Sequence, residues 1–234
     1  MDHQFIESLI EQVEFQVYPD NRVVTVHQIP EELQLVGKGT DAVVVRHLAY
    51  PRFAFKVYAR ERLDKLENEY KVYQQLGDSP YFCVCYSKGS RFLVLSYEQG
   101  PTLYECLEQG IVIPEQVIID VEQARAYVRK VGLNPRDIHL KNIIMQNGRA
   151  KLIDVSEYIR EGNDGRWEHL LQAYELFYPL IRGKRIPHWI IELVKRLYYK
   201  QVHQQFSLME FGRWFLHLFR NVKQDEDHVG KGEK

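Results

Sequence analysis

Cysteines, paired histidines and long apolar runs are all scarce in this chain of 234 residues. The three cysteines, Cys83, Cys85 and Cys106, are too few for a disulfide framework, so we expect reduced thiols that fill a core. None of the nine histidines stands in an H-x-x-x-H pair, and no zinc site is predicted. Because no run of about 18 apolar residues occurs, we expect no membrane-spanning helix and a cytoplasmic location.

The chain also lacks a charge excess of either sign. Its 31 Lys and Arg residues balance 32 Asp and Glu residues, which gives a formal net charge of −1 and no attraction to nucleic acid or to an anionic membrane. A content of 45% hydrophobic and 27% charged residues is typical of a globular protein. We therefore expect one large domain or two lobes, with neither nucleic acid nor membrane as a partner.

The first 30 residues form an N-terminal extension. Apolar residues recur at helical spacing between residues 3 and 15, and residues 22–27 follow as a short strand. The helix could pack onto the rest of the protein or bind a partner, and packing is the interpretation that we favour. The boundary of the extension lies near Pro30.

Residues 31–97 are predicted to form a sheet. Apolar and β-branched residues dominate short runs from Leu33 onward, and turns containing Gly or Pro separate these runs. One charged stretch instead has an apolar stripe at helical spacing. The prediction is a five-stranded antiparallel sheet with one inserted helix, with strands at 33–36, 42–48, 53–58, 81–87 and 91–96 and the helix at 61–76.

Residues 98–222 are predicted to be mainly helical, and residues 223–234 are too polar to pack. Within the helical part, residues 134–156 are predicted to contain a β-hairpin. The predicted fold class is therefore α+β, with a small antiparallel sheet and one helix followed by a mainly helical part. The predicted helices are 102–109, 114–132, 164–181, 187–199 and 207–219.

The hairpin carries three oxygen-bearing side chains. Asp137 and Asn142 lie five residues apart in a polar loop, and Asp154 follows the second apolar run. We expect the three side chains to converge at one end of the hairpin, where burial of an unpaired polar group would cost roughly 2–7 kcal/mol. Such a set either serves a function or is simply a turn rich in Asp and Asn, which is what turns normally contain.

Two features of the predicted sheet favour the functional interpretation. Gly37 and Gly39 stand in a turn where the backbone can approach phosphates closely, although a plain hairpin turn also explains them. Lys56 lies in the apolar strand AFKVY, where a charge needs a partner unless the side chain extends to the surface. Glu69 on the following helix could supply the opposite charge.

The candidate residues follow one another in the order Gly37-x-Gly39, Lys56, Glu69, Arg136-Asp137-x-x-x-x-Asn142 and Asp154. This order, with its intervals, resembles the motif set of the protein-kinase-like superfamily. The nearest description is a minimal, atypical (RIO-like) bacterial serine/threonine protein kinase. The resemblance implies a two-lobed fold, in which residues 31–97 form the N-lobe and residues 98–222 form a shortened C-lobe.

The resemblance implies a role for each position. Lys56 would bind the α- and β-phosphates of ATP and pair with Glu69, and Asp137 would accept or orient the proton of the acceptor hydroxyl. Asn142 and Asp154 would hold Mg²⁺. The implied nucleotide-binding residues are Gly37, Lys38, Gly39, Thr40, Val44, Lys56, Leu95, Ser96, Tyr97 and Glu98, and the implied catalytic residues are Asp137, Lys56, Glu69, His139 and Lys141.

Departures from the family pattern leave the phosphate acceptor open. His139 stands where protein kinases usually have a Lys and small-molecule kinases often have a His, and Lys141 could take the place of that Lys. Val155-Ser156 replaces the Phe-Gly of D-F-G, and no A-P-E follows, so a long peptide-docking segment is missing. We expect an ATP- and Mg²⁺-dependent serine/threonine protein kinase, which would act on a protein substrate. The alternatives are a small-molecule (aminoglycoside- or choline-kinase-like) kinase and a nucleotide-binding pseudokinase that acts as a scaffold.

Overall fold

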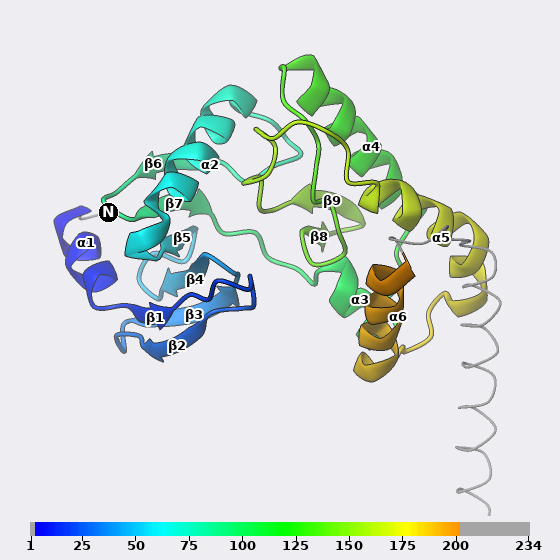
Figure 1. Cartoon of the computed structure of the whole chain (residues 1–234), viewed down its shortest axis with the longest axis horizontal. Helices are drawn as coiled ribbons and strands as arrows, with labels where there is room; N and C mark the ends of the chain where they lie inside the picture. Colours follow the sequence, from blue (N-terminus) through cyan, green and yellow to red (C-terminus); the bar gives the residue numbers. More distant parts are fainter. Residues whose placement is uncertain (1–2, 202–234) are drawn as a thin grey trace, which may run out of the picture. The chain divides into compact units, whose positions relative to one another are not determined.

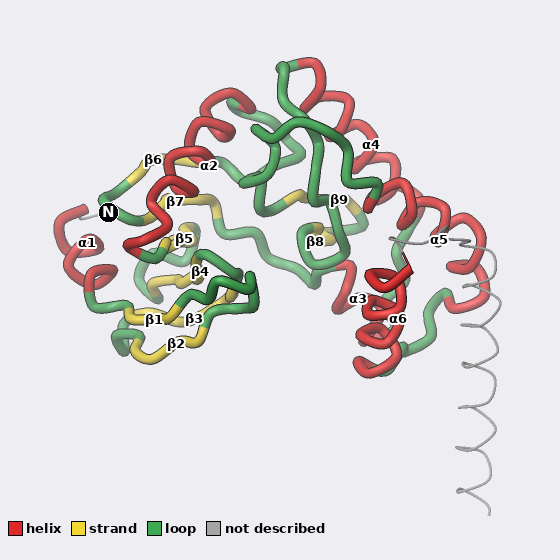
Figure 2. Tube along the Cα trace, viewed as in Figure 1, coloured by secondary structure: helices red, strands yellow, loops and turns green. Residues whose placement is uncertain are grey.

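A computed structural model describes residues 3–201, which fall into two units (Figures 1 and 2). The first unit comprises Met1–Leu103 and Pro114–Asp164, and the second comprises Tyr104–Ile113 and the chain from Gly165 onward. Helices and antiparallel strands are both present, so the expected α+β fold class is confirmed. The predicted helix at 207–219 and the predicted tail at 223–234 lie outside the described residues.

The first unit is built on a five-stranded antiparallel sheet in the order β3-β4-β5-β7-β6. The predicted fourth strand starts late, because the carbonyl of Tyr81 accepts a hydrogen bond from the amide of Leu152 at 2.8 Å and this stretch therefore pairs elsewhere. Within the sheet, Lys56 lies opposite Val44 on one side and Leu93 on the other. The strands are β3 (Leu33–Lys38), β4 (Ala42–His47), β5 (Phe53–Tyr58), β6 (Cys85–Lys88) and β7 (Phe92–Ser96).

The N-terminal extension packs on one face of this sheet. Its helix α1 (His3–Glu11) is shorter than predicted, because the chain leaves the helix to form β1 (Glu14–Gln16), which pairs with β2 (Thr25–Gln28). The apolar face of α1 is used inside the protein, as favoured from the sequence. The buried α1 residues Ile6, Leu9 and Ile10 share one apolar cluster with the sheet residues Val43, Val45, Phe55, Val57, Phe92 and Val94.

A buried arginine ties α1 to the sheet. The Nη2 group of Arg91 donates hydrogen bonds to the carbonyl oxygens of Ile10 (2.5 Å) and Val13 (2.7 Å), at the C-terminal end of the helix. A cation is also favourable at this end because the helix dipole is negative there. Glu7 accepts a hydrogen bond from the backbone amide of Ser90 at 3.0 Å. The extension is therefore an integral part of the first unit.

Helix α2 (Leu63–Leu76), preceded by the short helix η1 (Arg60–Arg62), lies on the opposite face of the sheet. Successive residues of a strand point to opposite faces. Accordingly, Phe55 belongs to the α1 cluster, whereas the side chain of Lys56 contacts Glu69 of α2. The buried positions of α2 have the spacing of an amphipathic helix, and Glu69 is the only acidic residue among them. The buried residues are Leu66, Glu69, Val72, Tyr73 and Leu76.

The predicted hairpin is present as β8 (Ile143–Gln146) and β9 (Arg149–Leu152). A buried carboxylate, Asp120 of α4 (Glu115–Lys130), holds it by accepting two hydrogen bonds of 2.8 Å from the guanidinium of Arg149 and one of 2.9 Å from the amide of Ala150. Burial alone would raise the pKa of Asp120, but these hydrogen bonds lower it. The hairpin is thus fixed on a helix of the same unit.

The second unit is helical in its described part, with α3 (Leu103–Gln109), α5 (Arg166–Ile181) and α6 (His188–Gln201). The amide of Ile113 donates a hydrogen bond to the hydroxyl of Tyr178 at 2.6 Å, which links the segment after α3 to α5. Among residues 3–201, no helix combines the length and the apolar character that crossing a bilayer requires.

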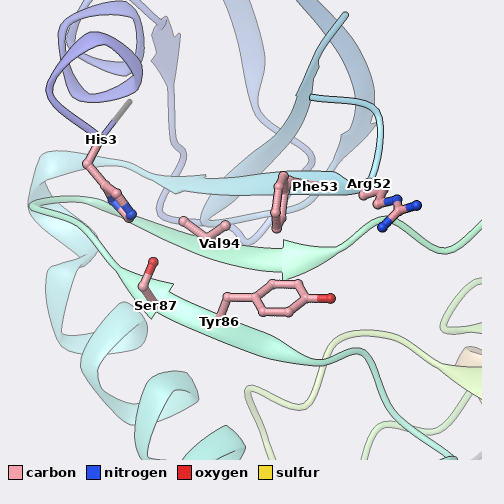
Figure 3. Close-up of a pocket in the computed structure, with 6 residues that line it drawn as sticks. All are labelled: His3, Arg52, Phe53, Tyr86, Ser87 and Val94. Atoms are coloured by element: carbon pink, nitrogen blue, oxygen red, sulfur yellow. The ribbon is translucent and has the colours of Figure 1, made fainter. Parts of the chain in front are cut away.

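A hollow of about 420 Å³ lies on the sheet beside the start of α1 (Figure 3). The rings of Phe53 and Tyr86 meet edge to face in it, with 5.2 Å between their centroids. Phe53 and Lys56 are three residues apart on β5, so their side chains point to opposite faces of the sheet and the hollow is separate from the surroundings of Lys56. The lining residues are His3, Arg52, Phe53, Tyr86, Ser87 and Val94.

Replacement of Ile10 by alanine tests whether the extension is integral to the fold. Ile10 is fully buried, whereas Phe5 on the same helix is 41% exposed. We expect Ile10→Ala to lower the free energy of unfolding by about 2–5 kcal/mol, because it removes buried apolar contacts. Phe5→Ala, the control, should change it by less than about 1 kcal/mol. Urea denaturation measures both values, and equal losses in the two variants would contradict an integral role for α1.

Candidate active site

Lys56 is the cation at the centre of the candidate site. Its side chain leaves β5 toward α2, where Nζ lies 2.9 Å from Oε1 and 2.6 Å from Oε2 of Glu69. The same Nζ lies 3.1 Å from Oδ1 of Asp154, which follows β9. The structure therefore brings a lysine and two carboxylates together from a strand, a helix and the end of the hairpin. We call these three residues the Lys56 triad.

Glu69 is held entirely within the protein. Its side chain has no exposed area, and the hydroxyl of Tyr58 donates a hydrogen bond to Oε2, in addition to the two contacts from Lys56. Burial raises the pKa of Glu69, and its contacts with Lys56 and Tyr58 oppose that rise. Burial would lower the pKa of Lys56, but the carboxylates of Asp154 and Glu69 outweigh it and raise that pKa. Lys56 is consequently a cation at neutral pH.

Asp154 occupies a backbone conformation that is rare for residues other than glycine, with φ of +65°. Its Oδ1 accepts hydrogen bonds from the hydroxyl of Ser156 at 2.7 Å and from the amide of Ser156 at 3.3 Å. Burial would raise the pKa of Asp154, but Lys56 and these hydrogen bonds lower it to about 2. The carboxylate is therefore ionised at neutral pH.

Asp137 and Asn142 lie in the loop before β8. Asp137 also has a positive φ, of +54°, and its amide donates a hydrogen bond to Oδ2 of Asp164 at 2.8 Å. The Nδ2 group of Asn142 donates to the carbonyl oxygen of Asp137 at 3.1 Å, so the amide oxygen of Asn142 remains an acceptor. The carbonyl of Asn142 accepts from the amide of Ile153 at 2.9 Å, which joins the loop to the residue before Asp154.

His139 faces Asp137 within the same loop. Its Nε2 lies 3.8 Å from Oδ1 of Asp137, and its Nδ1 accepts a hydrogen bond from the amide of Lys141 at 3.3 Å. An accepting Nδ1 belongs to the neutral tautomer that carries its proton on Nε2, the nitrogen on the Asp137 side. Asp137 and His139, both predicted as catalytic residues, are thus close in space. The third, Lys141, contacts the ring of His139 through its backbone amide.

The glycine turn lies between β3 and β4. Gly37 pairs with Val44, which in turn pairs with Lys56, so three predicted binding residues stand side by side on neighbouring strands. The amide of Gly39 donates to the carbonyl of Ala42 at 2.8 Å and closes the turn. Of the other predicted residues, Lys38 is exposed, and the hydroxyl of Thr40 donates to the carboxylate of the adjoining Asp41 at 3.1 Å.

Leu95, a buried residue of β7, lies just before the predicted adenine-binding linker, Ser96 to Glu98. The hydroxyl of Ser96 donates to Oε1 of Glu98 at 2.5 Å, and the other carboxylate oxygen of Glu98 accepts from the side chain of Gln146 of β8 at 3.1 Å. The amide of Tyr97 donates to the carbonyl of Arg52 at 2.9 Å. These bonds tie the linker to both the sheet and the hairpin.

The residues present suit a nucleotide with Mg²⁺. Asp154 offers a carboxylate and Asn142 an amide oxygen, and hard cations such as Mg²⁺ prefer oxygen ligands. Lys56 is a cation whose surroundings keep it charged, as binding to phosphate requires. The donor set therefore fits the magnesium and phosphate roles predicted from the sequence.

Comparison with known proteins identifies a relative of this chain. A Bacillus subtilis (strain 168) protein with the name "Putative serine/threonine-protein kinase YrzF" is 34% identical over 189 residues, which cover 80% of this chain and 88% of that protein. This chain belongs to the protein-kinase-like superfamily. Membership confirms the kinase-like fold that the motif order predicts, with the sheet and α2 in one part and a helical part after the linker.

Two further comparisons carry no information on the function of this chain. No model of a known protein family matches this kinase-like chain. One solved structure, "Co-crystal structure of WbdD and kinase inhibitor LY294002", matches with a TM-score of 0.47 and 15% identity, over 81% of this chain and 45% of that chain. The kinase-like chain thus spans less than half the length of that solved protein.

Two hydroxyl groups at the kinase-like site were not predicted from the sequence. Tyr58 lies two residues after Lys56, so the alternation of a strand already places it on the same face. Ser156 follows Asp154 at the spacing at which a serine hydroxyl commonly bonds a nearby aspartate or backbone group. These spacings were the available signals, but neither reveals which carboxylate the hydroxyl meets.

Replacement of Lys56 by methionine should destabilise the protein in a pH-dependent way. Loss of the cation leaves Glu69 buried without its partner, which we expect to cost about 3–5 kcal/mol at pH 8. In the variant the folded-state pKa of Glu69 lies above its unfolded value of about 4.3, so the folded state retains a proton that the unfolded state releases. The stabilising effect of that proton is present at low pH and is lost as the pH rises. The deficit in unfolding free energy, relative to the wild-type protein, should therefore be smaller at pH 5 than at pH 8.

Urea denaturation at the two pH values measures this deficit. Lys88→Met is the control, because Lys88 forms a more exposed ion pair with Glu67 at 2.5 Å and should lose at most about 1 kcal/mol at either pH. Deficits of Lys56→Met that are the same at pH 5 and pH 8 would contradict the buried pair.

Proposed function

We propose that this chain is an ATP- and Mg²⁺-dependent kinase that transfers the γ-phosphate of ATP to a serine or threonine hydroxyl of a protein. The observation that carries the proposal is the Lys56 triad, in which one ammonium, on a side chain that is 11% exposed, lies within 3.1 Å of the carboxylates of Glu69 and Asp154. Phosphoryl transfer needs positioned groups and neutralised charge more than it needs covalent chemistry. The triad supplies a fixed cation and, beside it, a carboxylate that is ionised at neutral pH.

Each part of the site has a task in this proposal. Lys56 would bind the phosphates, and Asn142 with Asp154 would hold Mg²⁺. The metal, when bound, would supply positive charge against the phosphate oxygens. The remaining nucleotide contacts would come from the glycine turn, with Lys38, Thr40 and Val44, and from the linker residues Leu95, Ser96, Tyr97 and Glu98.

Asp137 would receive or orient the proton of the acceptor hydroxyl. Its backbone is held from two sides, by Asp164 at its amide and by Asn142 at its carbonyl, which fixes the point from which its side chain extends. A positioned general base typically contributes about 10²–10⁴-fold to a rate. Lys141, four residues further on, could contact the transferred phosphate in place of the lysine that protein kinases usually have.

A protein acceptor is favoured by the relative from Bacillus subtilis, which is itself named as a serine/threonine-protein kinase. A small-molecule acceptor is the second candidate, and it is favoured by His139, whose Nε2 lies 3.8 Å from Asp137. Under the first candidate the partner is a protein with an accessible serine or threonine, in the cytoplasm. The lobe limits, 31–97 and 98–222, stay predictions.

Transfer of labelled phosphate from ATP tests the proposal. The purified chain is incubated with labelled ATP and Mg²⁺. The possible acceptors are the chain itself, cell-lysate proteins and a pool of hydroxyl-bearing metabolites. We expect label on protein, and we expect Asp137→Ala and Asp154→Ala to lose at least about a hundredfold in rate, because each removes a group that acts on the reacting atoms. Asp78→Ala, which changes an exposed aspartate, is the matched control and should keep the wild-type rate.

The outcomes separate the candidates. Label that appears on metabolites and never on protein would overturn the protein kinase in favour of the small-molecule kinase. Binding of Mg-ATP without transfer to any acceptor would instead indicate a pseudokinase.

A further inference from the structure

Two hydroxyl groups contact the carboxylates of the Lys56 triad, and each binds the same oxygen atom that faces Lys56. Oε2 of Glu69 lies 2.6 Å from Nζ of Lys56 and also accepts a hydrogen bond from the Tyr58 hydroxyl. Oδ1 of Asp154 lies 3.1 Å from Nζ and accepts the hydroxyl of Ser156 at 2.7 Å. Each carboxylate is thus held between the lysine and one hydroxyl.

Tyr58 connects α2 to the sheet independently of Lys56. It is 1% exposed, and its ring is fixed in β5, two residues beyond Lys56 on the same face of the strand. Because Glu69 has no exposed area, any displacement of α2 from β5 would break the bonds of both residues to the carboxylate and leave a buried charge unpaired. The hydroxyl therefore opposes an outward movement of α2.

Ser156 has the corresponding position at Asp154. Its hydroxyl and its amide both donate to Oδ1, the oxygen that also faces Lys56. With three contacts on Oδ1, the orientation of the other carboxylate oxygen is defined, although the residue has a φ of +65° that is unfavourable for aspartate. The serine thus stabilises a conformation that the backbone alone disfavours.

We propose that Tyr58 and Ser156 are positioning residues that hold the Lys56 triad assembled before a nucleotide binds. Only residues 155–165 lie between Asp154 and the start of α5, so the segment that orders many kinase sites when it is phosphorylated is short here. The two hydroxyls take over that task, and the site needs no phosphorylation to form. The consequence for catalysis rests on the proposed kinase function, whereas the assembly of the triad does not.

Amide hydrogen exchange of the nucleotide-free protein tests the assembly directly. Tyr58→Phe removes only a hydroxyl, and we expect the amides of α2 around Glu69 to exchange about tenfold faster, because a hydrogen bond to a charged group is lost. Tyr73→Phe is the matched control. Tyr73, which lies on α2, is also buried, but its hydroxyl has no hydrogen-bond partner among residues 3–201. Amide exchange should therefore change by less than about twofold in this variant.

For Ser156 the pair of variants is Ser156→Ala and Ser156→Thr. The alanine variant should speed exchange of the amides at 154–158 by about tenfold and weaken the affinity for Mg-ATP, measured by calorimetry, by a similar factor. The threonine variant keeps the hydroxyl and should restore both. Tyr58→Phe should likewise weaken Mg-ATP binding by about tenfold, with urea denaturation run in parallel to separate this effect from a global loss of stability.

The proposal is overturned if the α2 amides exchange at the same rate in Tyr58→Phe as in Tyr73→Phe. It is also overturned if the amides at 154–158 exchange at the same rate in Ser156→Ala as in the wild-type protein. If the wild-type protein neither binds Mg-ATP nor transfers phosphate, the proposed function fails, but the exchange measurements still decide the positioning roles. If instead the wild-type protein is an active kinase and the variants show the exchange of their controls, the positioning roles fail and the proposed function stands.

Discussion

The buried ion pair of Lys56 and Glu69 is the interaction on which the rest of the first unit depends. A charge in an apolar strand and a charge in the apolar stripe of a helix are each costly alone, because removal of either ion from water costs several kcal/mol. Burial becomes compatible with folding when the two meet and the remaining lone pairs are satisfied, as they are by the hydroxyl of Tyr58. The pair thereby fixes which turn of α2 faces β5.

The segments around this pair are strained, and the fold holds them in place. Asp137 and Asp154 both have positive φ angles, and such conformations cost of order 1–3 kcal/mol each. Asp164 anchors the first and Ser156 the second. Gly100, two residues after the linker, has a φ of +141°, and a side chain there would collide with the carbonyl oxygen of Met145, so only glycine allows the chain to pass this close to β8. Strain that is supported in this way keeps the polar groups in fixed positions.

Much of this arrangement could be predicted from the sequence, because alternating apolar residues and Gly or Pro turns are local signals. The pairing of Lys56 with Glu69 followed from the cost of an unpaired buried charge, and the structure contains that pair. The strand Glu14–Gln16 could not be predicted, since helical spacing runs up to it and only its pairing with a later strand ends the helix. The contacts of Tyr58 and Ser156 were equally out of reach, because a hydroxyl that bonds a carboxylate and one that faces water look the same in a sequence.

A crystal structure of the chain with Mg²⁺ and a non-hydrolysable ATP analogue tests the proposed site most directly. We expect phosphate oxygens within hydrogen-bond distance of Nζ of Lys56 while Lys56 still contacts Glu69, and a metal ion bound by Asn142 and Asp154. A nucleotide bound elsewhere, such as in the hollow beside Phe53 and Tyr86, or a metal ion that contacts neither Asn142 nor Asp154, would contradict the proposed site.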